Sequence, residues 1–163
     1  MSITYCMTCA QELTQHDDTC YECPDGHQYF NNPHTGASII FLKGNEFLAV
    51  QRAIEPHKGK YSFVGGFLQY GEDPQTAARR EAFEETGVQV GELELIDVTV
   101  QQYGPNETTC SLLYVTRDWQ GEFQAGDDAG RLEWKPLDFI VADEFAWQRP
   151  GLLAKLKTMA DNS

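Results

Sequence analysis

The stretch GFLQYGEDPQTAARREAFEETGV, residues 66–88, constrains the fold of this 163-residue chain more than any other segment. Asp73 is a favourable N-cap, because its carboxylate can accept hydrogen bonds from the first free backbone N–H groups of a helix. Pro74 suits the first helical position, and Gly87 suits the left-handed residue at which helices commonly end. These signals predict a helix over residues 74–86.

Three glutamates share one face of this predicted helix, because Glu81, Glu84 and Glu85 stand at positions i, i+3 and i+4. Like charges at this spacing weaken a helix by roughly 0.2–0.5 kcal/mol per pair. A hard divalent cation would offset the repulsion, and carboxylate oxygens favour Mg²⁺ or Mn²⁺. The alternative is a solvated acidic face without a ligand.

Four of the five cysteines lie in two C-x-x-C pairs near the N-terminus: Cys6, Cys9, Cys20 and Cys23. Two such pairs are typical of a zinc ribbon, in which two tight turns supply four ligands to one tetrahedral Zn²⁺. His27 or His16 could replace one ligand. Two disulfides are the other reading, and a reducing compartment argues against them. So short a ribbon needs metal for its folding energy.

The chain is strongly acidic, with 12 Lys and Arg against 25 Asp and Glu and a net charge of −13. Such a charge disfavours nucleic acid and anionic membrane surfaces as partners. No Lys or Arg occurs between Met1 and Asn32, which also argues against a nucleic-acid role for the ribbon. The first residues, MSITYCMTC, show no signal peptide, so we expect a cytoplasmic location.

The turn-rich segment Asn31–Gly36 indicates a boundary, and we divide the chain into a ribbon over 1–32 and a second domain over 33–163. Two strand-like segments, 37–42 and 47–52, predict a hairpin around a turn at 43–46. The run TTCSLLYVTR, 108–117, is apolar on both faces at its middle and indicates a central strand. Further expected elements are a strand over 93–102, a short edge strand over 133–137 and a C-terminal helix containing Leu152, Leu153, Leu156 and Met159.

The stretch 66–88 also resembles the signature of a known family, the Nudix box. Its order is Gly, five residues, Glu, seven residues, Arg-Glu, an aliphatic, any residue, Glu-Glu, any residue, Gly and an aliphatic. The residues in register are Gly66, Glu72, Arg80, Glu81, Ala82, Glu84, Glu85, Gly87 and Val88. The chain thus resembles the Nudix hydrolases over roughly residues 37–137.

This resemblance implies a Nudix-type α/β/α sandwich with a mixed sheet, preceded here by the small zinc ribbon. It implies hydrolysis of a pyrophosphate bond with Mg²⁺ or Mn²⁺. The metals would be carried by Glu81, Glu84 and Glu85, with the backbone carbonyl of Gly66. Arg80 and Glu72 would pair and brace the loop against the helix.

The general base is not fixed by the resemblance. Many family members carry a Glu three residues before the tryptophan equivalent to Trp134, and this chain has Arg131 there. Asp127, Asp128 and Glu133 lie nearby and are alternatives, as are the glutamates of the box.

A zinc ribbon ahead of this domain resembles the NADH pyrophosphatases, although their Ser-Gln-Pro-Trp-Pro-Phe-Pro signature is absent from 98–110. The loops 103–108 and 121–130 carry no Lys or Arg cluster to bind the outer phosphates of a triphosphate. We therefore expect a small nucleotide substrate, a nucleoside diphosphate linked to another group, such as ADP-ribose or NADH. Arg52, Phe63 and Tyr103 are candidate substrate contacts.

Two alternatives stay open. One is a nucleoside triphosphate pyrophosphatase that cleanses the nucleotide pool. The other, of a different class, is a non-catalytic nucleotide-binding sensor, which the intact box argues against. The sequence is also compatible with a homodimer.

Overall fold

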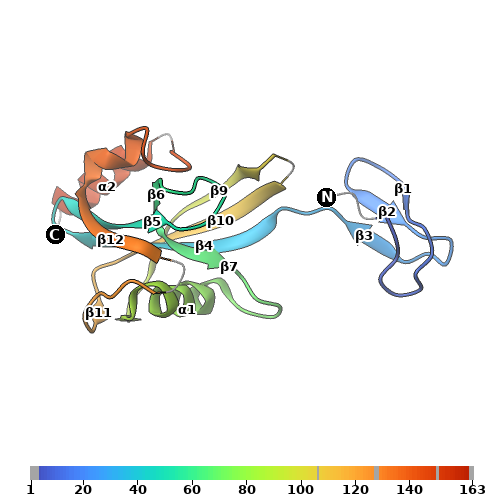
Figure 1. Cartoon of the computed structure of the whole chain (residues 1–163), viewed down its shortest axis with the longest axis horizontal. Coiled ribbons are helices and arrows are strands. Elements are labelled where there is room, and N and C mark those ends of the chain that lie inside the picture. The colour runs from blue at the N-terminus through green and yellow to red at the C-terminus, as the bar shows by residue number, and fades with distance from the viewer. Residues whose placement is uncertain (1–3, 106, 127–128, 150, 162–163) are drawn as a thin grey trace.

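A computed structural model describes residues 4–105, 107–126, 129–149 and 151–161. The N-terminal segment forms a three-stranded antiparallel sheet of β1 (Thr14–Gln15), β2 (Cys20–Glu22) and β3 (Gln28–Phe30). In Figure 1 this small sheet stands beside a larger unit, to which it is joined at the start of β4.

The larger unit is built on a seven-stranded mixed sheet. Its main strands run in the order β12-β5-β4-β10-β9, with β6 paired to β5 and β7 to β4. The parallel pair is β4–β10, and the other pairs are antiparallel. This confirms the mixed sheet that the family resemblance implied. The strands are β4 (His34–Lys43), β5 (Glu46–Arg52), β6 (Tyr61–Ser62), β7 (Val64–Phe67), β9 (Glu94–Gly104), β10 (Glu107–Thr116) and β12 (Ala129–Pro136).

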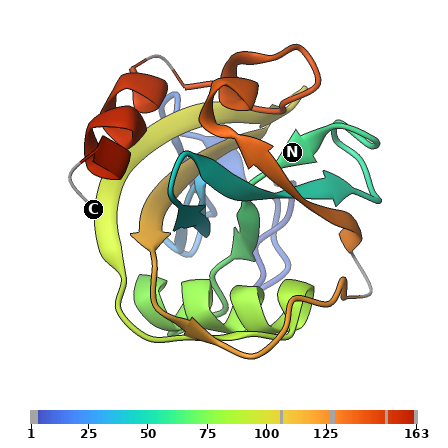
Figure 2. The same ribbon diagram turned by 90° about the vertical axis from the view of Figure 1, so that its left-hand side faces the viewer.

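Strand β4 divides the core into two clusters, because successive side chains of a strand point to opposite faces. Ile39 and Phe41 belong to one cluster, with Ala77, Ala78 and Ala82 of helix α1 (Pro74–Thr86). Ile40 and Leu42 belong to the other, with residues of η1 (Leu137–Val141) and α2 (Leu152–Asp161). Helical layers therefore cover both faces of the sheet, as Figure 2 shows with α1 and α2 on opposite sides.

Helix α1 has the predicted bounds and the predicted caps. Asp73 Oδ1 accepts hydrogen bonds from the backbone N–H groups of Gln75 and Thr76, at 3.0 and 3.1 Å. Gly87 ends the helix with φ of 74°, in the left-handed region that glycine adopts readily. The helix packs its small alanines on the sheet, which brings its backbone close to β7.

Several predicted elements are confirmed and some boundaries are corrected. The hairpin of β4 and β5 is present, with a turn shorter than expected, and β10 lies centrally between β4 and β9. Residues 34–36 are not part of a hinge: they open β4, because His34 pairs with Thr109 of the parallel neighbour. The edge strand β12 is longer than predicted. A separate pair joins β8 (Gln89–Val90) to β11 (Trp119–Gln120).

In the described part of the chain, neither helix reaches the length and apolarity needed to cross a bilayer.

Candidate active site

Arg80 is the centre of the polar network on α1. Its Nε and Nη2 donate to the two carboxylate oxygens of Glu72, at 2.9 and 3.0 Å. Its Nη1 donates to Glu81 at 2.7 Å and to Glu84 at 2.9 Å, and Nη2 also reaches the carbonyl oxygen of Phe67. These carboxylates raise the pKa of Arg80 and hold it charged. One guanidinium thus offsets part of the repulsion within the acidic face and ties the preceding loop to the helix.

Glu81 lies against the backbone of β7 with no space between them. A Cβ added at Gly66 would lie 2.4 Å from Glu81 Oε1, so any larger residue at this position requires the carboxylate to move. Desolvation by burial raises the pKa of Glu81, and Arg80 opposes this effect. The Glu81 carboxylate therefore lies against the backbone of Gly66 at the wall of the cavity.

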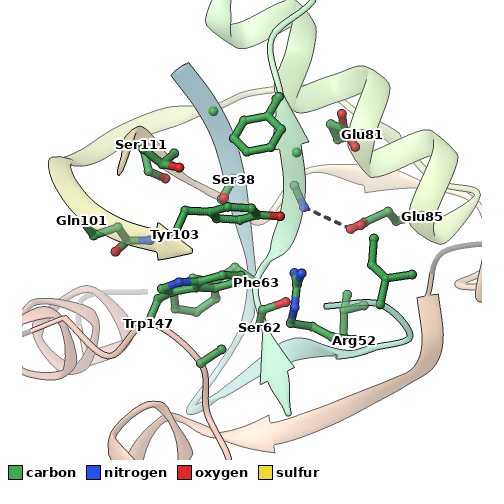
Figure 3. A pocket seen from close by; sticks show the side chains of 18 of the residues that line it. Ser38, Arg52, Ser62, Phe63, Glu81, Glu85, Gln101, Tyr103, Ser111 and Trp147 are labelled. Atoms are coloured by element: carbon green, nitrogen blue, oxygen red, sulfur yellow. Dashed lines mark hydrogen bonds between the residues drawn. The ribbon is translucent and has the colours of Figure 1, made fainter. Parts of the chain in front are cut away.

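Glu85 is oriented by the neighbouring glycine. Its Oε2 accepts a 3.0 Å hydrogen bond from the backbone N–H of Gly65, drawn dashed in Figure 3. Glu81 and Glu85 both line a cavity of about 320 Å³. Glu84 does not belong to the described lining of this cavity, and its side chain is 54% exposed. The helix thus presents two carboxylates to the cavity and turns the third toward solvent.

The three predicted substrate contacts all line the same cavity: Arg52 from β5, Phe63 beside β7 and Tyr103 from β9. Figure 3 shows Tyr103 and Phe63 across the cavity from the glutamates of α1. The resemblance and the sequence pattern therefore identified residues of both walls.

Sequence reasoning missed other residues of the cavity, among them Trp147, Thr109, Ser111 and Arg149. Arg149 is buried and donates to Asp97 at 3.2 Å and to Ser111 at 2.9 Å. Burial lowers the pKa of Arg149, and Asp97 opposes this effect. No local motif marks these residues, because long-range strand pairing and the chain after η1 bring them here.

Of the three downstream carboxylates that are candidates for the general base, the structure describes only Glu133. Glu133 forms ion pairs with Arg131 and Lys135 on β12. The hydrogen bond from Lys135 lowers the pKa of Glu133, so this carboxylate stays ionised. Both of its oxygens are already paired with Arg131 and Lys135. Among the described residues, the cavity lining does not include Glu133. Asp127 and Asp128 lie outside the described residues.

A second polar cluster lies in the N-terminal sheet. The ligand atoms of Cys6, Cys9, Cys23 and His27 all lie within 4.8 Å of one another. Cys20, predicted as the fourth member, is placed elsewhere: it is buried, and its Sγ lies 3.9 Å from the carbonyl oxygen of Tyr21. His27 occupies its place because the turn after Cys23 brings the imidazole back, with Nδ1 3.3 Å from Cys23 Sγ.

The thiols of this cluster are not bonded to one another. All five cysteines are free, and Cys9 Sγ lies 3.6 Å from Cys23 Sγ. Burial raises the pKa of Cys6, but hydrogen bonds from the Tyr29 hydroxyl and from backbone N–H groups outweigh it and lower the pKa below its ordinary value. Cys6 is therefore favoured as a thiolate, which is the form that binds metal. At Cys9 the backbone N–H of Gln11 lowers the pKa, but burial and the neighbouring thiols of Cys6 and Cys23 outweigh it and raise the pKa to about 12.

A sequence model of the NUDIX domain matches residues 32–156, most of the chain. The chain belongs to the Nudix family. Two relatives with different names are similar to this chain. The chain is 30% identical over 113 residues to an ADP-ribose pyrophosphatase of Methanocaldococcus jannaschii, covering 69% of this chain and 67% of that protein. It is 31% identical over 122 residues to an 8-oxo-dGTP diphosphatase of Escherichia coli, covering 74% of this chain and 93% of that protein.

The Nudix fold is also shared with solved structures. A Nudix hydrolase from Nitrosomonas europaea superposes with a TM-score of 0.71 and 22% identity, covering 98% of this chain and 92% of that one. This likeness concerns the fold. The box residues discussed above thus lie in a Nudix domain, as the sequence predicted.

Proposed function

We propose that this chain is a metal-dependent pyrophosphohydrolase that cleaves a nucleoside diphosphate linked to another group, such as ADP-ribose or NADH. The observation that carries the proposal is the cavity itself. Two carboxylates of the box, Glu81 and Glu85, form one wall, and the aromatic residues Phe63, Tyr103 and Trp147 form the other. This arrangement suits a phosphate group on one side and a planar ring on the other.

The first wall fits Mg²⁺ or Mn²⁺. Carboxylate and carbonyl oxygens are the donors that these ions prefer. Glu81 and Glu85 line the cavity together with Gly66, whose backbone carbonyl would be the third donor. Glu84 would complete the set from the exposed side of the helix. When bound, the ion supplies positive charge that polarises the phosphoryl group and lowers the pKa of water. Arg80 keeps the carboxylates aligned, and Glu72 keeps Arg80 in place.

The charge balance of the cavity favours two phosphates over three. The described lining contains two cationic side chains, Arg52 and Arg149. Arg149 is paired with Asp97, whereas Arg52 has no carboxylate partner among the described residues. One uncompensated arginine together with metal ions matches a diphosphate, which carries about two charges, better than a triphosphate with about four. The relative named ADP-ribose pyrophosphatase agrees with this assignment.

The test is a comparison of kcat/KM with Mg²⁺ and with Mn²⁺. ADP-ribose and NADH are set against the common nucleoside triphosphates, 8-oxo-dGTP and dinucleoside polyphosphates. We expect an NDP-linked substrate to have the highest value and a nucleoside monophosphate to be released. A triphosphate preferred by more than about tenfold, or about 1.4 kcal/mol in transition-state binding, overturns the proposal. In that case the other relative, named 8-oxo-dGTP diphosphatase, indicates the better assignment.

We also propose that the N-terminal sheet holds one structural Zn²⁺ through Cys6, Cys9, Cys23 and His27. Tetrahedral Zn²⁺ with bonds of about 2.0–2.3 Å places its ligands roughly 3.3–3.8 Å apart. Three separations agree: 3.6 Å for Cys9–Cys23, 3.6 Å for Cys6–His27 and 3.3 Å for Cys23–His27. The metal would join the turn at Cys6–Cys9 to the turn after β2.

A further inference from the structure

The two edges of the large sheet differ in the charges that they carry. The sheet ends at β12 on one side and at β9 on the other. An edge strand exposes unpaired backbone groups, and soluble proteins commonly protect such a strand with charged side chains or proline. Strand β12 has this protection, because it contains Arg131, Glu133, Lys135 and Pro136. Strand β9 has none over residues 98–104, whose sequence is VTVQQYG.

The unprotected part of β9 also lacks a hydrogen-bonding neighbour on its outer side. Within the described residues, the backbone of 98–102 is hydrogen-bonded to β10 and to no other strand. Lys155 donates to the carbonyl oxygen of Ile96, and Arg149 donates to Asp97, so α2 and the segment before it reach only the first part of β9. Figure 2 shows this strand, in yellow, at the outer edge of the sheet.

Two apolar side chains on this part of β9 face solvent. Val98 and Val100 are 55% and 61% exposed. They point to the same face, because they are two residues apart, and they lie opposite Leu112 and Cys110 of β10. The pairing with β10 is regular over residues 97–102, so no bulge turns this edge away from an approaching strand.

The charge distribution along β9 suits a second copy of the same strand. The chain has a net charge of −13, so two copies repel one another unless they meet at an uncharged segment. The two carboxylates of β9, Glu94 and Asp97, both precede Val98. The segment from Val98 onward is therefore a place where two of these acidic chains can approach closely.

An antiparallel pair of two β9 strands centred on Thr99 is self-complementary. In this register Val98 of each copy lies opposite Val100 of the other, so four valines gather on one face. Asp97 lies opposite Gln101, and the other acidic residue of the strand lies opposite a glycine. No carboxylate faces another carboxylate, and like charges at facing positions are what destabilises such pairs.

We propose that this protein forms a homodimer in which β9 of one copy pairs antiparallel with β9 of the other, about a two-fold axis at Thr99. The two large sheets then form one continuous sheet, held by main-chain hydrogen bonds and by the buried valines. This interface is independent of the proposed function. It also affects the cavity, because Gln101 and Tyr103 of β9 belong to the cavity lining, and pairing restrains the strand that carries them.

Analytical ultracentrifugation over a range of protein concentrations measures this association. We expect the mass of the wild type to rise from 18.4 kDa toward twice that value, with a dissociation constant in the micromolar range. Val98→Lys places a charge in the paired face, and we expect it to raise the dissociation constant at least about tenfold. The control is Val141→Lys, because Val141 is 51% exposed on η1, and its dissociation constant should stay within about twofold of the wild type.

The register is tested by mixing variants. Residue 98 of one copy should face residue 100 of the other, so Val98→Lys chains mixed with Val100→Glu chains bring opposite charges together. We expect these heterodimers to bind at least about fivefold more tightly than either variant alone. In a mixture of Val98→Lys with Val98→Glu the two charges lie diagonally across the pair, at about 7–8 Å, and the gain should be smaller.

Hydrogen exchange gives a second readout. The backbone amides of residues 98–102 should exchange more slowly at high protein concentration than at low concentration, and this difference should vanish in Val98→Lys. A wild type that stays monomeric at every concentration overturns the inference, and so does a dimer that Val98→Lys leaves intact. None of these measurements involves hydrolysis, so the dimer and the proposed substrate class stand or fall separately.

Discussion

Arg80 holds Glu72 through both carboxylate oxygens, with Nε to Oε1 at 2.9 Å and Nη2 to Oε2 at 3.0 Å. The same guanidinium binds Glu81 and Glu84, so a single side chain connects the loop before α1 to the acidic face of the helix. Two parallel bonds of this kind fix both distance and orientation. Of the two carboxylates that line the cavity, Glu81 is therefore positioned by Arg80, a cation that does not belong to the described cavity lining.

Replacing this cation tests that role. Arg80→Lys keeps the charge but cannot form the forked pair with Glu72. We expect a loss of about 1–3 kcal/mol in the free energy of unfolding, measured by urea denaturation without metal. The neighbouring Arg79→Lys is the control, because exposed Arg79 bonds mainly to backbone and to Gln75 and should lose less than about 0.5 kcal/mol. Equal losses in the two variants would contradict the bracing role.

The carboxylate at the cavity wall should carry catalysis. We predict that Glu85→Gln lowers kcat by at least about 10²-fold, because charge stabilisation by the metal is worth several kcal/mol. Steady-state kinetics measure the loss, and circular dichroism checks that the fold survives. Glu94→Gln, an exposed carboxylate on β9, serves as the control and should be neutral. Near-wild-type turnover of Glu85→Gln would contradict the assignment of this box glutamate as a metal ligand needed for catalysis.

A methyl group should not fit between Glu81 and β7. In Gly66→Ala, the new Cβ would lie 2.4 Å from Glu81 Oε1, so the carboxylate must move. We expect kcat/KM to fall by about tenfold or more, since displaced ligands hold the metal poorly. Gly104→Ala gives the comparison, because its backbone is not left-handed and the nearest atom to its added Cβ lies at an ordinary 3.6 Å. Activity of Gly66→Ala equal to that of Gly104→Ala would show that this close approach is unimportant.

Zinc content distinguishes the two sets of ligands. Elemental analysis of protein purified in metal-free buffer should give about one Zn²⁺ per chain. We expect Cys20→Ser to retain zinc and His27→Ala to lose it, because His27 and not Cys20 lies beside the other three thiols. Zinc lost from Cys20→Ser and kept by His27→Ala would restore the ligand set predicted from the two C-x-x-C pairs. Removing the metal should unfold the small sheet and leave the Nudix core folded.

Local signals were read correctly from the sequence. The bounds of α1 follow from Asp73, Pro74 and Gly87, whose effects depend on the adjoining turns of the chain. The turn propensity of residues 34–36 was misleading, because pairing of His34 with Thr109 in a parallel ladder outweighs it. Strand pairing depends on partners far along the chain, which no local window contains.

The two walls of the cavity show the same contrast between local signals, which can be read from the sequence, and long-range packing, which cannot. Glu81 and Glu85 were predicted because one helix turn brings them together and the spacing matches a known signature. Trp147 carried no such signal, since its approach to Arg52 requires the whole sheet and the segment after η1 to be folded. The presence of His27 instead of Cys20 beside Cys6, Cys9 and Cys23 likewise depends on the shape of one turn. Both sets of four residues are compatible with the spacing in the sequence.

The parallel pairing of β4 with β10 also affects the order of events during synthesis on the ribosome. Strand β4 emerges early, whereas β10 follows only after the hairpin, the helix and β9 have been made. The small N-terminal sheet has only local pairings and can close at once. Non-local ladders form late, because the intervening loop must first be closed. The nascent chain therefore carries a closed N-terminal sheet ahead of an unpaired hydrophobic hairpin. If this sheet binds zinc as proposed, a shortage of zinc would leave it unfolded before the enzyme domain is complete.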